Sequence, residues 1–434
     1  MAEFPVLQCT VLMKRPTKTT RRSVSIFAQI VHQLPGHLIE HLAAKQTIKA
    51  RELSYSTQLH LLMLGQFLHA FSLNELVDIS QVHCKELSRI RGITPAKLNT
   101  FSNANRTRNP KVAEDYYWML RDRFSRETPG FRNVRNRGAL ARFKTRRVFA
   151  VDASVIPLSL RSMDWAKYIH RKAAAKLHMR TNVANMLPDF VVIGKGRHHE
   201  VARAGDMCAD LKAGDITVVD RGYYDFEWFW SLTERDVTFV TRERGPMNLE
   251  VKEDLREGQD DGMIELDQRV ELVRERSWDK YPGEFRRIRA NVEIDGKVRP
   301  LVFVTNNFTW AARTIADLYK SRWTVEVLFK ELKQTLQLQS FYGTNEKAVQ
   351  WQIWAALIVH LVLRYLAFKS RWCGSYSRFV GLIRTAIWMK TDLETLLVFY
   401  GIAPPRKTHK MRIRAPYLPG FEKAYLDAVG QQSP

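Results

Sequence analysis

The segment YKSRWTVEVLFKELK, from Tyr319 to Lys333, combines an apolar repeat with charged side chains at helical spacing. Because a helix turns by about 100° per residue, one stripe of roughly 80° is predicted to present Tyr319, Arg322, Glu326, Lys330 and Lys333. The neighbouring stripe is apolar and contains Leu318, Val325, Phe329, Leu332 and Leu336. We therefore expect one amphipathic helix over about residues 311–336, with its polar stripe accessible.

The periodicity leaves two interpretations of the polar stripe open. A carboxylate with an arginine one turn before it and a lysine one turn after it is suited to phosphate chemistry at a metal ion. An ordinary surface helix stabilised by the i,i+4 ion pairs Arg322–Glu326 and Glu326–Lys330 would show the same pattern. The rest of the chain favours the first interpretation.

The composition indicates a basic protein with real cores. The 434 residues are 45% hydrophobic, which is enough for two or three domains. There are 68 Lys and Arg against 45 Asp and Glu, a formal net charge of +23. Such an excess favours a polyanionic partner, most often nucleic acid, over a generally basic protein without one.

Cysteine spacing and hydropathy predict a cytoplasmic protein without a membrane span. Four cysteines stand far apart with no CxxC pair, which argues against a disulfide framework or a zinc knuckle: Cys9, Cys84, Cys208 and Cys373. Residues 1–11 show no secretory signal. The most apolar segment, Ile353–Phe368, is interrupted by His360 and Arg364, so we expect a buried helix there.

The N-terminal third is predicted to be helical and to contact DNA. Ser72 and Glu75 fit a capping box, and Thr94-Pro95 fits the start of another helix. That second helix carries polar side chains that could reach phosphates and base edges or could simply be exposed: Asn99, Ser102, Asn103, Asn105 and Arg106.

A strongly basic segment follows over residues 121–147. It holds ten Lys or Arg against Asp122 and Glu127, and Pro129-Gly130 breaks any helix there. Like charges at this density repel one another unless a partner neutralises them, so we expect a cationic link that follows a DNA backbone. The candidate DNA-end contacts are Asn103, Asn105, Arg106, Arg146 and Arg147.

The pattern then changes to strands, two of which lead into an acid. The apolar runs Val148–Val151 and Ile216–Val219 are followed directly by Asp152 and Asp220. Residues at strand ends are rigidly held yet accessible, which suits catalysis. Further strands are expected over 174–183, 190–193, 237–242 and 301–305, with a helix over 225–233.

The segment 243–300 is charged and reads as a strand-rich insertion, with an Asp295-Gly296 hairpin signal. Beyond Gly343, helices are predicted to continue to about Tyr400. A basic, irregular tail then begins at Pro404-Pro405.

Asp152, Asp220 and Glu326 would repel one another if they converge, unless cations neutralise them. Hard oxygen ligands select Mg²⁺ or Mn²⁺, and two such ions about 3.5–4 Å apart can promote an in-line phosphodiester displacement. Arg322, Lys330 and Lys333 would then hold phosphates, and Tyr319 could hydrogen-bond one. Convergence is the hypothesis that the sequence suggests.

The sequence around these residues resembles that of the DDE transposases of bacterial insertion sequences, in the insertion-sequence-4 family. Its signature is Tyr, two residues, Arg, three residues, Glu, six residues, Lys, which Tyr319, Arg322, Glu326 and Lys333 match without gaps. The likeness covers roughly residues 25–370. It includes VFAVDAS around Asp152, KLH at 176–178, VVDRGYYDF at 218–226, FVTRE at 239–243, TNNF at 305–308, QSFYGTNEKAVQWQIW at 339–354 and LNTFSNANRTR at 98–108.

The resemblance implies an α/β fold with a ribonuclease-H-like catalytic core over 146–345 and a β-rich insertion at about 243–300. It implies a helical DNA-binding region with a basic linker over 1–145 and a C-terminal helical region with a basic tail over 346–434. Asp152, Asp220 and Glu326 resemble the metal ligands, for two Mg²⁺ ions that Mn²⁺ can replace. Tyr319, Arg322 and Lys333 resemble the phosphate contacts.

The implied activity is cut-and-paste transposition in the bacterial cytoplasm, at the nucleoid. Double-stranded DNA, as terminal inverted repeats and target, would be cleaved and joined within a synaptic homodimer. Better-understood members use a hairpin intermediate. The sequence departs from the family at Ser154, where Thr is usual, and at Asn182, where many relatives carry Asp. No Trp occurs in Leu301–Thr305, where a relative stacks a flipped base, and Trp310 lies just beyond.

Three other interpretations of the sequence compete with transposition. His198-His199-Glu200 could suggest a transition-metal hydrolase, although adjacent His side chains diverge and rarely chelate alone. The second is a transposase-derived DNA-binding protein that has lost catalysis, against which the intact acidic triad argues. The third is a structure-specific nuclease without strand transfer, and the long basic helical region favours transposition over it.

Overall fold

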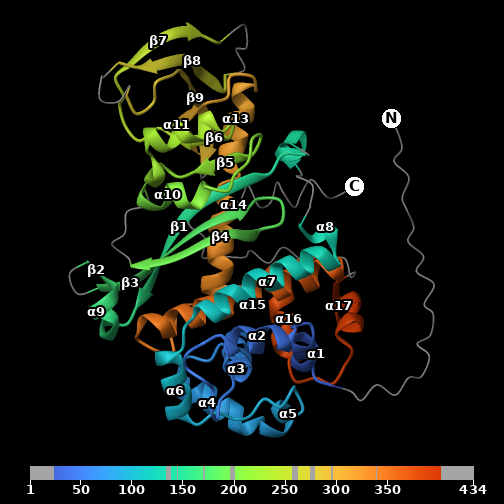
Figure 1. The fold of residues 1–434 in the computed structure, drawn as a ribbon. Coiled ribbons are helices and arrows are strands. Elements are labelled where there is room, and N and C mark those ends of the chain that lie inside the picture. The colour runs from blue at the N-terminus through green and yellow to red at the C-terminus, as the bar shows by residue number, and fades with distance from the viewer. Residues whose placement is uncertain are drawn as a thin grey trace, which may run out of the picture.

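The computed structural model describes residues 24–132, 138–143, 145–169, 172–195, 201–256, 262–273, 279–294, 297–338 and 340–401. A mixed α/β part built on one large sheet stands on a body of helices (Figure 1). His198–Glu200, the Asp295-Gly296 turn, residues 133–137, Lys144 and both basic termini lie outside the described residues, so the expectations for them stay untested.

The sheet has ten strands in the order β2-β3-β1-β5-β6-β10-β9-β8-β7, with β4 paired to β3. β1 pairs antiparallel with β3 and parallel with β5, and β5 pairs parallel with β6. The first six strands are β1 (Val148–Leu158), β2 (Lys167–Ile169), β3 (Lys172–Asn182), β4 (Leu187–Lys195), β5 (Ile216–Val219) and β6 (Thr238–Arg242). The strands expected from the apolar runs are therefore present.

The charged segment after β6 forms the antiparallel half of the same sheet. Its strands are β7 (Leu249–Asp254), β8 (Ile264–Leu272), β9 (Phe285–Ile294) and β10 (Lys297–Thr305). β10 pairs with both β9 and β6, so these strands extend the central sheet. Short helices α10 (Val201–Cys208) and α11 (Phe226–Glu234) lie on one side of it (Figure 1).

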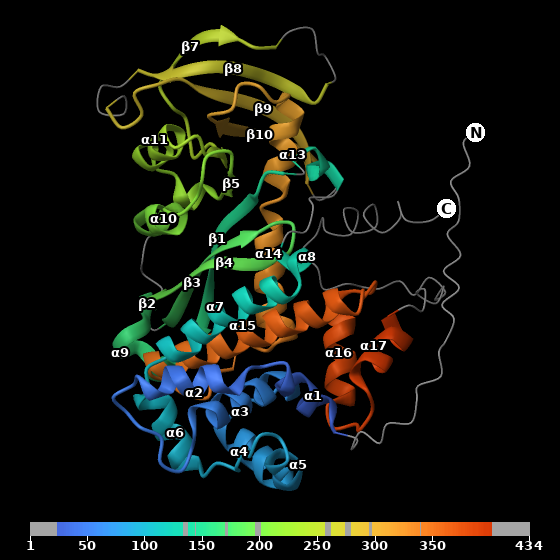
Figure 2. The same cartoon turned by 45° about the vertical axis from the view of Figure 1, so that its right-hand side comes forward.

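Helices from the two ends of the chain form one helical body. The N-terminal ones are α1 (Ile26–His32), α2 (Gly36–Ala44), α3 (Tyr55–Leu68), α4 (Leu73–Val82), α5 (Cys84–Ser88), α6 (Leu98–Thr107), α7 (Lys111–Glu127) and α8 (Pro129–Arg132). The C-terminal ones are α15 (Glu346–Lys369), α16 (Tyr376–Ala386) and α17 (Leu393–Gly401). Figure 2 shows both sets packed together below the sheet.

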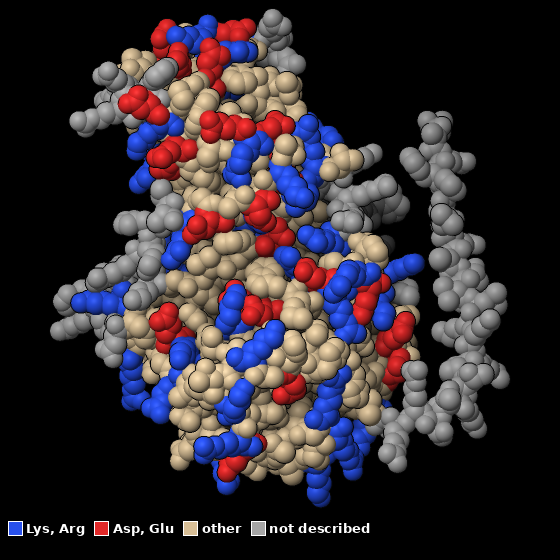
Figure 3. All heavy atoms as spheres, in the orientation of Figure 1, with Lys and Arg blue, Asp and Glu red and all other residues tan. Residues whose placement is uncertain are grey.

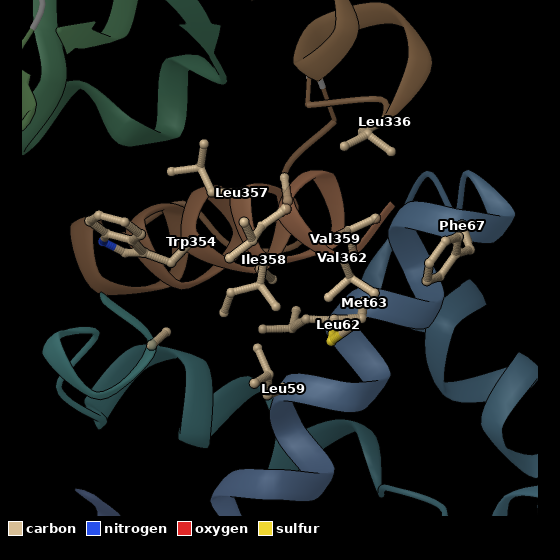
Figure 4. Close-up of a cluster of buried hydrophobic side chains, with 14 of the residues drawn as sticks. Leu59, Leu62, Met63, Phe67, Leu336, Trp354, Leu357, Ile358, Val359 and Val362 are labelled. Atoms are coloured by element: carbon tan, nitrogen blue, oxygen red, sulfur yellow. The ribbon is translucent and has the colours of Figure 1, made fainter. Parts of the chain in front are cut away.

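The N-terminal and C-terminal helices share one hydrophobic core. Buried Leu59, Leu62 and Met63 of α3 face Ile358 and Val362 of α15 (Figure 4). The backbone is joined as well, because Ile26 N–H donates to the Met389 carbonyl at 3.0 Å.

The long apolar helix α15 is the centre of this body. It is long and apolar enough to cross a membrane by composition, but most of that stretch is buried against the surrounding helices. Burial of its whole circumference explains why it lacks a polar face. The prediction of a buried helix over Ile353–Phe368 is confirmed.

Of the two helix starts predicted from the sequence, one is confirmed and the other is wrong. The Ser72 hydroxyl accepts from Glu75 N–H at 3.1 Å, as the capping box predicts. The predicted helix start at Thr94-Pro95 is wrong, because α6 begins at Leu98 and the residues before it are irregular. Ala96, in this segment, is buried.

Candidate active site

Two aspartates lie side by side where parallel strands end their pairing. The last paired residues of β1 and β5 are Val151 and Val219, and Asp152 and Asp220 follow them directly. β1 itself continues through Asp152 to Leu158 because it keeps its antiparallel partner β3, so Asp152 is not at the end of the strand as expected. The parallel register nevertheless places both acids at one edge, as the hypothesis required.

The segment predicted as one helix over 311–336 is divided into three. α13 (Ala312–Lys320) is followed by α14 (Trp323–Lys330) and a π-helical turn, η4 (Glu331–Thr335). At the junction the Ser321 and Arg322 N–H groups donate to carbonyls three residues earlier, and the Ser321 hydroxyl donates to the Leu318 carbonyl. These bonds compete with the i−4 ladder and interrupt it.

α14 packs against β1 and β3, and this brings Glu326 to the two aspartates. The link is Arg322, the residue before α14. Its guanidinium lies 2.9 Å from Asp152 Oδ2, 2.7 Å from Glu326 Oε1 and 4.0 Å from Asp220 Oδ1. The three acids that are far apart in the sequence therefore converge on one cation.

The convergence changes the acidity of Asp152. Burial raises its pKa from 3.8 to about 7, while Arg322 and the Ala153 N–H oppose the shift and Asp220 and Glu326 reinforce it. The same three acids, together with Tyr319, raise the pKa of Arg322, which stays charged. The site thus holds one strongly desolvated carboxyl beside a permanent cation.

This shift predicts a pH dependence of stability in the metal-free protein. The folded-state pKa of Asp152 is raised above its unfolded value, so the protein is most stable where the carboxyl is protonated. This contribution to the free energy of unfolding is lost as the pH rises through about 7. We expect Asp152→Asn to be more stable than the parent above pH 7, on the order of 2 kcal/mol. The two should converge towards pH 4 in denaturant titrations. A difference independent of pH would contradict the assignment.

The polar stripe is only partly accessible. Tyr319 is buried, with its ring 5.1 Å from that of Phe303, so the expectation of a presented tyrosine is wrong. Burial raises its pKa, and the Arg322 guanidinium lies 5.6 Å from its ring. Lys333 is half-buried and donates to the Val155 carbonyl on β1 at 2.8 Å. Lys330, the last residue of α14, is exposed.

The N-terminal candidates divide into exposed and structural residues. Asn103 and Arg106 are exposed on α6 and bond each other at 3.2 Å. Asn105 is buried and accepts from Gln58 at 2.8 Å, so it belongs to the core and is not placed for a DNA contact.

The two arginines before β1 also differ. Arg146 lies 5.4 Å over the ring of Trp310 and is exposed. Arg147 forms a two-bond ion pair with buried Asp215, with 2.8 Å from its Nε to Oδ1. Arg147 thus fixes the start of β1 against the loop before β5, a role that the charge of the basic segment could not reveal.

Two contacts near the site were not predicted from the sequence. His178 on β3 lies 2.9 Å from the Tyr223 hydroxyl, in the turn after Asp220. Glu331, in the π-helical turn, is bonded to His360 at 3.0 Å and to Arg364 at 2.6 Å. The signal for the second was present, because His360 and Arg364 interrupt an apolar helix and need a buried partner.

The donor set suits a hard cation. Within the described ranges no three His, Cys, Asp or Glu side chains form a ready metal cage, and Arg322 lies among the three acids. Carboxylate oxygens around a desolvated Asp152 are ligands that Mg²⁺ and Mn²⁺ prefer. The residues present therefore fit a divalent ion, provided that the guanidinium moves aside.

Comparison with known proteins places this site in a family. Residues 143–362, about half of the chain and the whole of the site, match the family described as the transposase DDE domain. The putative transposase y4zB of Sinorhizobium fredii is 29% identical over 248 residues, which cover 57% of this chain and 68% of that protein.

Two further relatives belong to insertion sequences. The probable transposase for element IS5377 of Geobacillus stearothermophilus is 31% identical over 51% of this chain and 57% of its own length. Transposase InsG for element IS4 of Escherichia coli is 24% identical over 55% of this chain and 54% of its own length. The resemblance drawn from the sequence motifs is confirmed: this chain belongs to the transposase DDE domain family.

Proposed function

We propose that Asp152, Asp220 and Glu326 are the catalytic and metal-binding residues of a cut-and-paste transposase. The observation that carries this proposal is their convergence on the single guanidinium of Arg322, at 2.9, 4.0 and 2.7 Å. An ordinary surface helix with i,i+4 pairs would not bring two aspartates from neighbouring strands to the same cation. The second interpretation of the polar stripe is therefore disfavoured.

We infer a ribonuclease-H-like core. Three antiparallel strands, β4, β3 and β1, are followed across the sheet by the parallel strands β5 and β6, and both aspartates lie where this pattern changes. The four strands β7–β10 serve as the β-rich insertion between Asp220 and Glu326. α14 carries the last acid onto β1.

The reaction is hydrolysis and then transesterification of phosphodiesters. In cleavage, a water oxygen bonds to phosphorus while the bond to the leaving 3′-oxygen breaks, and that oxygen takes up a proton. In joining, the new 3′-hydroxyl oxygen bonds to a phosphorus of the target DNA while the bond from that phosphorus to the target's own 3′-oxygen breaks. The hydroxyl loses its proton, and the released 3′-oxygen takes one up. Two divalent ions, when bound, would activate the attacking oxygen and stabilise the leaving one.

Chain residues would supply the binding geometry. We assign the phosphate contacts to Arg322, Lys330 and Lys333. Tyr319 is buried with its ring 5.6 Å from the Arg322 guanidinium and would support Arg322 from the core. The charge of +23 favours double-stranded DNA as the partner. On the face in Figure 3, Lys and Arg are spread over both the sheet and the helical body. Action in the cytoplasm as a synaptic homodimer on terminal repeats belongs to the same proposal.

The direct test uses DNA that carries the sequences flanking the gene. Incubation with the purified protein and Mg²⁺ should release the element with 3′-hydroxyl ends, and addition of a target plasmid should give joined products. Cleavage without joining would favour a structure-specific nuclease. Binding without cleavage, in Mg²⁺ and in Mn²⁺, would reject the catalytic assignment.

A further inference from the structure

A cavity of about 240 Å³ lies where the helical body meets the start of β1. Helices α7 and α8 contribute one side of it, and the residues from Thr145 to Phe149 and the β3–β4 turn contribute the other. Val148 and Phe149 precede Asp152 by three or four residues, which corresponds to roughly 10–13 Å along a strand. The cavity is therefore separate from the three carboxylates but within a few nucleotides of them.

The lining of this cavity is strongly cationic. It contains four arginines, against one carboxylate, Asp189: Arg121, Arg132, Arg146 and Arg147. Asp189 offsets at most one of the four, because it accepts from Arg121 at 3.0 Å and also from Arg180, outside the lining, at 2.8 Å. Arg147 is held by Asp215, which lies outside the lining.

Several donors of the lining are available to a bound anion. The Arg121 Nε–H is buried and has no hydrogen-bond partner among the described residues. The side chain of Arg132 is exposed at the rim. Asn182 accepts from Ala184 N–H through Oδ1, which leaves its amide nitrogen as a donor. These are the kinds of donor that an oxyanion requires.

We propose that this cavity binds a backbone phosphate of a DNA strand that runs between the helical body and the carboxylates. Guanidinium forks match phosphate oxygens, and the volume admits a phosphate group with part of its sugar. The position between the two parts of the protein favours a strand that spans them. The inference rests on the proposed function, since it takes the strand to continue to Asp152.

Two arginine substitutions test the proposal. Arg132→Gln removes a rim guanidinium and keeps the backbone carbonyl that accepts from Asn185 at 3.1 Å. Arg121→Gln removes the buried donor. The matched control is Arg123→Gln, also on α7, where the side chain pairs with Glu127 at 2.6 Å and does not line the cavity.

Binding of a mixed-sequence duplex is measured by fluorescence anisotropy over a range of salt. Each cavity variant should bind about tenfold more weakly, because a charge-assisted contact is lost. The slope of log affinity against log salt should fall in magnitude by about 1, while the control stays within about twofold of the parent. Unchanged affinity and slope in both cavity variants would overturn the proposal.

Inorganic phosphate distinguishes a DNA site from a site for a small anion. Phosphorus NMR should show line broadening with the parent protein that both cavity variants reduce. Loss of phosphate binding with unchanged DNA affinity would overturn the proposal in favour of a free anion. Weakened DNA binding in the variants, with no cleavage by the parent, would support the cavity and reject only the proposed chemistry.

Discussion

Asp152→Asn, Asp220→Asn and Glu326→Gln are each expected to lower DNA cleavage by about 10³-fold or more. Each substitution removes one negative oxygen from a set that must hold divalent ions, and metal catalysis contributes several kcal/mol to such a step. Cleavage of end-labelled DNA carrying the flanking repeats measures the loss. DNA binding should persist, because the phosphate contacts come from other side chains.

The matched control for these variants is Asp317→Asn. Asp317 lies on α13 next to the site segment and pairs only with Lys320, at 3.5 Å, among the described residues. It should cleave like the parent. Cleavage within about tenfold of the parent by any of the three site variants would exclude that residue as a metal ligand.

Arg322→Gln is expected to strengthen metal binding and to weaken DNA cleavage. Without the guanidinium the three carboxylates repel one another, so Mn²⁺ should bind the DNA-free protein about tenfold more tightly. Cleavage should nevertheless fall by about 10²-fold, because a phosphate contact is lost as well. Electron paramagnetic resonance of Mn²⁺ measures the first effect and the labelled-DNA assay the second.

Arg313→Gln, an exposed arginine on α13, is the control for the charge change. If Arg322→Gln binds Mn²⁺ no more tightly than this control, Arg322 does not occupy the place of the metal. The arginine would then be a purely structural brace between β1 and α14.

The strands that hold the two aspartates could be predicted because their signal is local. Each contains a short apolar run followed directly by an acid, and the parallel pairing of β1 with β5 brings the two acids to one edge. Glu326 was predictable from helical spacing, since Arg322 one turn before it does contact it. Which strands and helices pack together depends on contacts between residues far apart in the sequence, and periodicity does not reveal these contacts. The convergence of the three acids was therefore expected from the resemblance to the family's motifs.

Burial of single polar residues could not be predicted in the same way. Asn105 looks like its exposed neighbour Asn103 in the sequence, but it points to Gln58, which comes from a distant helix. Tyr319 was assigned to the polar stripe on the assumption of an uninterrupted helix. The shift to i−3 hydrogen bonds at Ser321 breaks that assumption and leaves the ring against Phe303.

The shared core of the two chain ends has a consequence for synthesis. Because α3 packs on α15, the first helices leave the ribosome long before their apolar partners exist. A polypeptide truncated ahead of Glu346 would keep Leu59, Leu62 and Met63 uncovered and is expected to aggregate or be degraded. Genes interrupted before the codon for Glu346 should therefore yield no DNA-binding fragment able to compete with the intact protein at its own ends.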